Sequence, residues 1–188
     1  MNILRHAFAG ALFLATATGA FVAQAADFIT IQLKDGPVVI ELNDKAPQHA
    51  ERIKALATAG EYDNVAFHRV IEGFMAQTGD VQYGDMENGY QAQAAGMGGS
   101  SQPDLPAEFS DIPFERGTVG MARSQDPNSA NSQFFIMFAP GDFLNGQYTV
   151  VGKVVSGMEN VDKIKRGDDA NNGSVSEPDR MIKVTVGK

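Results

Sequence analysis

The most specific pattern in this chain is FHRVIEGFMAQTGD, which spans residues 67–80. It overlaps two β-rich runs, Val65–Val70 and Phe74–Thr78, which favour strands. The first run carries Arg69, a fixed cation with a planar fork of donors, and Gln77 follows eight residues later. An amide in that position can orient a guanidinium or hold a carbonyl group, so these two polar side chains are the first candidates for a site.

Further β-like runs lie on both sides of this pattern. They are Phe28–Leu33, Val38–Leu42, Thr118–Ala122, Gln133–Phe138, Tyr148–Val155 and Met181–Val186. The first two flank Lys34-Asp35-Gly36, a turn signal that predicts a hairpin. The run at Ser132–Phe138 is apolar at consecutive positions, so we expect both of its faces to be covered.

Two helices are expected among these strands. Pro47 can occupy the first turn of one helix, and Gly60 can end it. Its inner face would consist of Ala50, Ile53, Leu56 and Ala57. A second, shorter helix is predicted at Met158–Arg166, before Gly167. Many short strands, two helices and 20 glycines predict a mainly β fold with a closed or nearly closed antiparallel sheet.

The segment Val81–Glu108 has no clear period and holds much of the glycine. It is either a disordered insertion or a structured functional loop, and a loop of that length inside a compact domain is more often functional. No repeat and no linker divides the rest of the chain. We therefore expect one domain over residues 26–188.

Composition narrows the classes of function. The 188 residues include 15 Lys and Arg against 23 Asp and Glu, and this acidic balance disfavours binding to nucleic acid. The absence of cysteine excludes disulfides, thiol nucleophiles and cysteine-ligated metals. The usual hydrolase, nucleotide-binding and zinc motifs are missing, and His49 and His68 lack ligand spacing with any carboxylate pair. We expect no metal and no other cofactor.

The first 25 residues have the layout of a secretory signal peptide. Arg5 and His6 precede the apolar stretch Ala7–Phe21, and Val22-Ala23-Gln24-Ala25 offers an A-x-A cleavage site. The apolar stretch is too short for a spanning helix, and no later stretch is apolar for long enough. We expect cleavage after Ala25 and export to the periplasm, with no membrane span in the mature chain. The alternative is an N-terminal anchor that stays attached.

Two further blocks strengthen the pattern at residues 67–80. These are NSQFFI at residues 131–136 and FLNG at residues 143–146, followed by Tyr148. Together the three blocks resemble the cyclophilins, whose pattern is F-H-R-x-I-x-G-F-M-x-Q-x-G-D, and the resemblance runs from Thr30 to Val186. It implies an eight-stranded antiparallel closed β-barrel capped by two α-helices. It also implies peptidyl-prolyl cis-trans isomerase activity on proline-containing unfolded or partly folded polypeptides, and we expect a monomer.

The same resemblance implies a site. The catalytic residues would be Arg69 and Gln77. The apolar socket for the proline ring would consist of Phe74, Met75, Phe135 and Leu144. The positions for the peptide backbone and the groove wall would be Ala122, Arg123, Ser124, Gln133, Phe143 and Tyr148. Gly96 is a weaker correspondence, because Gly84–Gln91 reads as an insertion before it.

These residue types suit isomerisation of an X-Pro bond. Rotation about an amide meets a barrier of about 18–20 kcal/mol because nitrogen shares its lone pair with the carbonyl. Twisting frees that lone pair, and an arginine can donate a hydrogen bond to it. A catalyst that binds the twisted state more tightly than the planar states gains about tenfold in rate for each ~1.4 kcal/mol of difference.

Each assignment has a structural alternative. Arg69 can be a surface cation in an ion pair, the apolar residues can be ordinary barrel core, and Gln77 and Gln133 can simply satisfy backbone groups. Two other functions are also open. One is a binding module that grips proline loops without turnover, and the other is a holdase chaperone that uses the apolar groove or the long loop.

Three positions depart from the pattern of many eukaryotic cyclophilins. Phe143 stands where those proteins have tryptophan, Tyr148 where they have histidine, and Arg123 where asparagine is common. The first two changes leave catalysis as expected but predict weak binding of cyclosporin. The third changes the rim of the groove.

Overall fold

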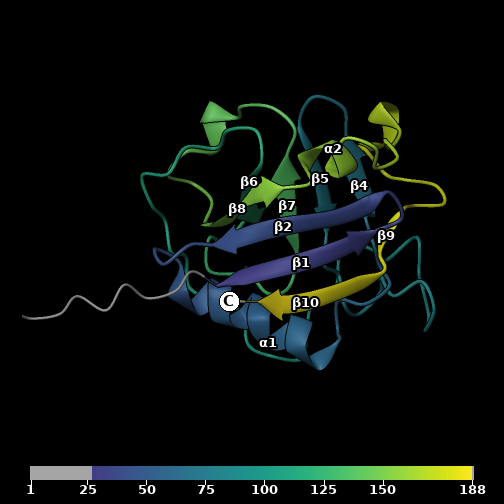
Figure 1. Ribbon diagram of the computed structural model, residues 1–188, viewed down its shortest axis with the longest axis horizontal. Helices are drawn as coiled ribbons and strands as arrows, with labels where there is room; N and C mark the ends of the chain where they lie inside the picture. The colour runs from purple at the N-terminus through teal and green to yellow at the C-terminus, as the bar shows by residue number, and fades with distance from the viewer. Residues whose placement is uncertain (1–26, 188) are drawn as a thin grey trace, which may run out of the picture.

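The computed structural model describes residues 27–187, and its main feature is an eight-stranded antiparallel sheet. The strand order is β10-β1-β2-β8-β6-β7-β5-β4. The strands are β1 (Phe28–Leu33), β2 (Gly36–Leu42), β4 (Arg69–Ile71), β5 (Met75–Thr78), β6 (Thr118–Met121), β7 (Phe134–Met137), β8 (Val150–Ser156) and β10 (Lys183–Gly187). The sheet curls on itself, so β1, β2 and β10 lie in front of β5 and β7 in Figure 1. The predicted strand number and antiparallel pairing are confirmed.

The curled sheet is not a strictly closed barrel, which corrects the prediction of full closure. Within the described residues, β4 and β10 end the strand order and share no ladder. A two-stranded sheet of β3 (Val65–Ala66) and β9 (Arg180–Met181) lies just before them in the chain. The predicted runs at 65–70 and 181–186 are therefore each divided between two sheets. In the first run, the Phe67 N–H donates to the Asp179 carbonyl at 2.8 Å, which extends the pairing of β3 with β9 by one residue before the chain enters the large sheet at Arg69.

Helices α1 and α2 lie at opposite ends of the curled sheet (Figure 1). Helix α1 (Pro47–Ala59) begins and ends as predicted, with Gly60 in the left-handed region at φ 75° and its N–H bonded to the Ala57 carbonyl. Helix α2 (Met158–Val161) is shorter than the predicted 158–166. After it, the Lys163 N–H donates to Asn160 and the Ile164 N–H to Val161, so the chain tightens into i→i+3 turns instead of continuing the helix.

The main core lies inside the curl of the sheet. It contains the predicted inner face of α1, and all four residues of β7 are buried, which confirms that both faces of that strand are covered. Two polar residues of α1, His49 and Arg52, are buried as well. His49 Nδ1 lies 2.6 Å from the Glu108 carboxylate, which also accepts the Gln48 and His49 N–H groups of the first helical turn.

The segment after β5 is folded and not a disordered insertion. The fully buried Asp80 carboxylate accepts backbone N–H groups from Gln82 (3.1 Å), Tyr83 (2.9 Å), Gly96 (2.7 Å) and Gly98 (2.9 Å). A single carboxylate thus ties the beginning and the middle of this segment to the residues just after β5. The structured alternative for residues 81–108 is the correct one.

The predicted signal peptide and its cleavage site lie outside the described residues. Within residues 27–187, no helix has the length and apolar character needed to cross a membrane.

Candidate active site

A row of residues directly opposite one another crosses four strands. Arg69 of β4 is paired with Gln77 of β5, Gln77 with Phe135 of β7, and Phe135 with Gly120 of β6. Side chains of directly paired residues lie on the same face of a sheet, so the guanidinium, the amide and the phenyl ring are neighbours. A β-carbon at Gly120 would come within 2.5 Å of the Phe135 ring, so the missing side chain makes room for that ring.

The Arg69 guanidinium is held by three hydrogen bonds. Its Nη1 donates to Gln77 Oε1 at 3.2 Å, its Nη2 to Asn172 Oδ1 at 2.9 Å, and its Nε to the Asn172 carbonyl at 3.0 Å. A guanidinium has five N–H donors, so one remains on each Nη. The remaining Nη1 donor has only a weak acceptor, Met75 Sδ at 3.8 Å, among the described residues. Partial burial lowers the pKa of Arg69, but an arginine stays charged at neutral pH.

Two glutamine amides continue this arrangement away from Arg69. Gln77 Nε2 donates to Gln133 Oε1 at 2.9 Å, and Gln133 Nε2 donates to the Gly98 carbonyl at 2.8 Å. Each amide therefore donates away from Arg69 and leaves the Gln77 oxygen facing the guanidinium. The predicted orienting role of Gln77 fits this geometry, and Gln133 keeps Gln77 in that orientation.

An apolar layer lies beside the guanidinium, outside the main core. Its buried members are Met75, Phe114, Phe135, Met137, Leu144 and Val150, and Ile71, Phe74, Ile112, Ala122 and Tyr148 pack against them partly exposed. The four residues predicted for the proline socket are brought together here. Met75 and Phe135 are only 2% and 5% exposed, so they lie at the bottom of the predicted socket. Sequence reasoning missed Phe114, which stacks on Phe135 with ring centroids 5.8 Å apart.

The remaining predicted residues lie around this apolar layer. Phe143, in the 3-10 turn η1 (Asp142–Leu144), is 66% exposed and lies 5.6 Å from the Phe74 ring. Tyr148 meets Phe135 edge to face at 6.0 Å. Arg123 lies over the Tyr148 ring at 4.2 Å and donates to the Gln147 carbonyl at 2.8 Å. Ser124 is exposed beside Arg123, and its hydroxyl lies 2.7 Å from Ser129 Oγ.

A cavity of about 420 Å³, the second cavity, adjoins the apolar layer and shares Ala122 with it. It is lined by Gln77, Gly96, Met97, Gly98, Gly99, Ser100, Asp104, Ala122, Arg123, Ser124, Ser129, Asn131 and Gln133. Gly96, which the family resemblance placed at the site less securely than the other residues, thus lines this cavity. A β-carbon at Gly96 would be 3.0 Å from the His68 ring. Burial lowers the pKa of His68 to about 4, so this ring is neutral at neutral pH.

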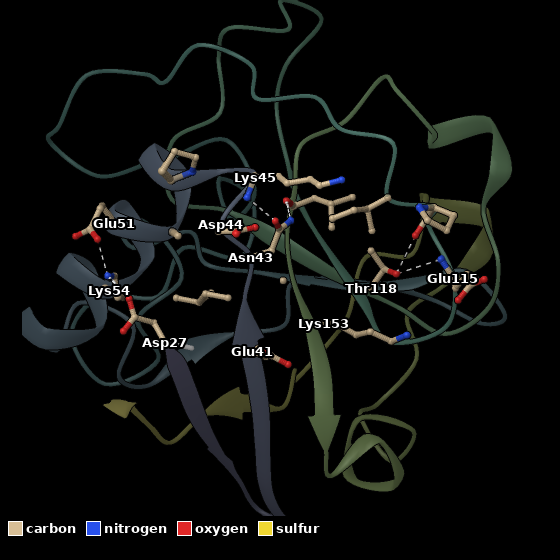
Figure 2. A pocket seen from close by; sticks show the side chains of 17 residues that line it. Asp27, Glu41, Asn43, Asp44, Lys45, Glu51, Lys54, Glu115, Thr118 and Lys153 are labelled. Carbon is tan, nitrogen blue, oxygen red and sulfur yellow. Dashed lines mark hydrogen bonds and ion pairs between the residues drawn. The ribbon is translucent and has the colours of Figure 1, made fainter. Parts of the chain in front are cut away.

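A larger cleft of about 770 Å³ lies elsewhere and lacks these features. Figure 2 shows Glu51 and Lys54 of α1 on one side, Thr118 and Glu115 on the other, and Glu41 and Lys153 on the strands between them. The described residues that line it include neither an arginine nor an aromatic ring. Lys54 is paired with Asp27 at 2.6 Å and with Glu51 at 2.5 Å. This cleft has neither a cationic donor fork nor an apolar socket, so the groove beside Arg69 is the better candidate.

The contact of Asn172 with Arg69 could not be predicted from the sequence. Asn172 lies 103 residues from Arg69 in the chain and reaches it from the end of the turn η2 (Asp169–Asn171). It holds a left-handed conformation at φ 54°, which asparagine adopts more readily than most residues. The sequence DDANNG suggests a turn but does not indicate which strand the turn meets.

Comparisons with known proteins agree with this geometry. The family model described as cyclophilin type peptidyl-prolyl cis-trans isomerase/CLD matches residues 28–186. A probable peptidyl-prolyl cis-trans isomerase of Brucella suis is 61% identical, over 99% of this chain and 97% of its own. Peptidyl-prolyl cis-trans isomerase B of Escherichia coli is 38% identical, over 73% of this chain and 83% of its own.

Solved structures of cyclophilins have the same fold. Cyclophilin AquaCyp293 of Hirschia baltica superposes with a TM-score of 0.70 at 24% identity, over 84% of this chain and 73% of its own. A cyclophilin type peptidyl-prolyl cis-trans isomerase of Cryptosporidium parvum, crystallised in the presence of the dipeptide Ala-Pro, gives 0.69 at 25% identity, over 86% of this chain and 99% of its own. With the family model matching nearly all of the described residues, this chain belongs to the cyclophilin-type peptidyl-prolyl cis-trans isomerases.

Proposed function

We propose that this isomerase accelerates rotation about X-Pro bonds by donating a hydrogen bond from Arg69 to the nitrogen of the twisted amide. The observation that carries the proposal is the row Arg69–Gln77–Phe135, which places the guanidinium beside the apolar layer. In this scheme the proline ring packs against Met75 and Phe135. The nitrogen of that ring then lies on the side of Arg69, where a donor on each Nη is left over after the bonds to Gln77 and Asn172.

No covalent bond forms or breaks in this scheme. A planar amide nitrogen is a poor acceptor because its lone pair is delocalised, whereas the twisted nitrogen is a good one. The hydrogen bond from Arg69 is therefore stronger in the transition state than in either ground state, which is the condition for catalysis. Bracing by Gln77 and Asn172 reduces the side-chain entropy that Arg69 loses when it engages the nitrogen.

The test is the isomerase activity of Arg69→Ala and Arg69→Lys in a protease-coupled assay on an X-Pro peptide. Alanine removes the donor, and lysine replaces the fork by a point charge, so both should lower the rate constant more than they weaken peptide binding. Arg180→Ala is the matched control, because Arg180 pairs with Glu87 at 3.2 Å on β9, away from the groove. Near wild-type turnover in a folded Arg69→Ala protein would refute the proposed role.

We further propose that the substrates are exported polypeptides that have not finished folding, and that isomerisation assists their folding in the periplasm. The support is the signal-like layout of residues 1–25, together with the partly exposed apolar residues Phe74, Ala122 and Tyr148 near Arg69, which an unfolded chain can contact. Intact mass of the protein recovered from the periplasm tests the export step, with Ala26 expected as the first residue. Recovery of the full chain beginning at Met1 would contradict it.

A further inference from the structure

Helix α1 contains a buried cation that the amphipathic pattern does not explain. Arg52 is 7% exposed and lies between the buried residues His49, one turn before it, and Leu56, one turn after it. Burial of a charge is costly unless it is paired, and within the described residues Arg52 forms no ion pair with a carboxylate. A buried arginine that is compensated only by neutral groups indicates that its hydrogen bonds serve a geometric purpose.

The partners of Arg52 are the backbone carbonyls of Asn131, which lines the second cavity, and of Pro103, which precedes the lining residue Asp104. Nη2 donates to the Pro103 carbonyl at 2.7 Å, and Nη1 donates to the Asn131 carbonyl at 3.3 Å. These acceptors lie 51 and 79 residues further along the chain. The planar fork of one arginine therefore joins α1 to the segment 98–104 and to the residues that lead into β7.

Asn131 continues the contact into the wall of the cavity. Its Oδ1 accepts the Ser100 N–H at 2.8 Å and the Ser100 hydroxyl at 2.8 Å. Its Nδ2 donates to the Gln102 carbonyl and to Asp104 Oδ1, both at 2.9 Å. The segment 98–104 thus wraps around the Asn131 side chain, and Arg52 holds both the segment and Asn131 from the helix side.

The other end of the segment 98–104, at Gly98, contacts the two glutamines that lead to Arg69. The Gly98 carbonyl accepts from Gln133 Nε2, and Gln133 in turn accepts from Gln77. A β-carbon at Gly99 would be 3.0 Å from the Asn131 side chain, so the segment packs closely on Asn131 and has little room to shift. A displacement at Pro103 would therefore change the shape of the second cavity first and the orientation of Gln133 and Gln77 second.

We propose that Arg52 is a positioning residue that sets the shape of the second cavity and thereby selects the residues flanking proline in the substrate. The inference rests on the proposed function of the groove. Gln77 lines the second cavity and is paired with both Arg69 and Phe135, so a peptide whose proline lies beside Arg69 and Phe135 brings a flanking side chain to the second cavity. Arg52 does not touch the substrate and acts through Pro103 and Asn131.

The variants are Arg52→Met, Arg52→Lys, Asn131→Ala and the double variant of Arg52→Met with Asn131→Ala. Methionine keeps the length and apolar stem of arginine without the donors, and lysine keeps the charge without the fork. Lys54→Met is the control on the same helix, because Lys54 pairs with Asp27 and Glu51 and does not contact the segment 98–104. Thermal unfolding of every variant separates positioning from loss of fold.

The first readout is kcat/KM for peptides that contain one proline and differ in the side chains two and three positions before and after it. We expect Arg52→Met to change the ratio between the best and worst peptides by about tenfold, since a displacement of about 1 Å can cost up to about 100-fold. Arg52→Lys should recover part of the selectivity. Arg52→Met and Asn131→Ala should be non-additive in the double variant, because they act on one segment.

The second readout is the NMR shift of the Gln133 and Gln77 side-chain amides and of the Gly98 N–H in the free protein. These signals should move in Arg52→Met and stay in place in Lys54→Met. They do not depend on turnover, so a failure of the Arg69 mechanism leaves this measurement intact. An equal loss of activity on every peptide, or unmoved amide signals in a folded Arg52→Met protein, would overturn the inference. If Arg52→Met does not fold, Arg52→Lys and Asn131→Ala carry the same test.

Discussion

Replacing Asn172 by glycine isolates one of the bonds that brace Arg69. The change removes the Oδ1 acceptor, 2.9 Å from Arg69 Nη2, and keeps the backbone carbonyl that accepts from Nε at 3.0 Å. Glycine also tolerates the left-handed conformation at φ 54° that alanine would strain. The variant therefore removes a single hydrogen bond without distorting the turn.

The expected loss can be worked from the exposure of the bond. Hydrogen bonds to charged groups contribute about 1.5–3 kcal/mol when buried. Asn172 is exposed and Arg69 is half-buried, so water can replace part of the lost bond and about 1 kcal/mol is a suitable estimate. A similar value follows from the cost of ordering a long side chain, about 0.5–1.5 kcal/mol. The expected result is a fall in kcat/KM of about fivefold.

The assay is protease-coupled isomerisation of an X-Pro peptide, with thermal unfolding measured alongside. Asn171→Ala is the matched control, because Asn171 bonds to Asp168 at 2.8 Å and does not reach Arg69. Asn172→Asp should also lower activity, since a carboxylate beside the guanidinium competes for its donors. Equal activity of Asn172→Gly and Asn171→Ala would show that bracing from this turn does not contribute to catalysis.

Two further predictions concern the exposed residue Phe143 and the buried residue His68. Cyclosporin should inhibit this enzyme weakly, and Phe143→Trp should tighten inhibition by roughly one or two powers of ten. The reason is that an indole adds contact area and an N–H donor on a residue that is 66% exposed. A cyclosporin titration of isomerase activity in which the variant gains nothing would show that Phe143 does not control binding of the drug. Burial lowers the pKa of His68 from 6.5 to about 4, so between these pH values the unfolded chain binds a proton that the folded chain does not. The free energy of unfolding should therefore fall by about 3 kcal/mol as the pH falls from 6.5 to 4, and His68 should have no such effect above pH 6.5. Denaturant unfolding of the wild type and of His68→Gln across that window checks the sign, and parallel curves would contradict it.

The proximity of Arg69 and Gln77, the two residues predicted to be catalytic, was predictable because it depends on a short stretch of chain. Arg69 and Gln77 lie in adjacent antiparallel strands, and their separation of eight residues suits a short hairpin that places them opposite each other. The apolar socket was only partly predictable. Phe74, Met75, Phe135 and Leu144 followed from the family resemblance, but Phe114 and Met137 look like ordinary core in the sequence. Groove and core are lined by the same residue types, so only the packed structure separates them.

The sequence alone determined the elements whose causes are local. Alternating and continuous apolar runs predict the strands, and Pro47 with Gly60 defines α1, because these signals depend on backbone conformation within a few residues. Tertiary structure decided the division of the runs at 65–70 and 181–186, the turn that brings Asn172 to Arg69, and the contact of Arg52 with Pro103. Each of these depends on hydrogen bonds or packing between segments far apart in the chain. No local propensity encodes such contacts, because their partners meet only once the sheet has curled.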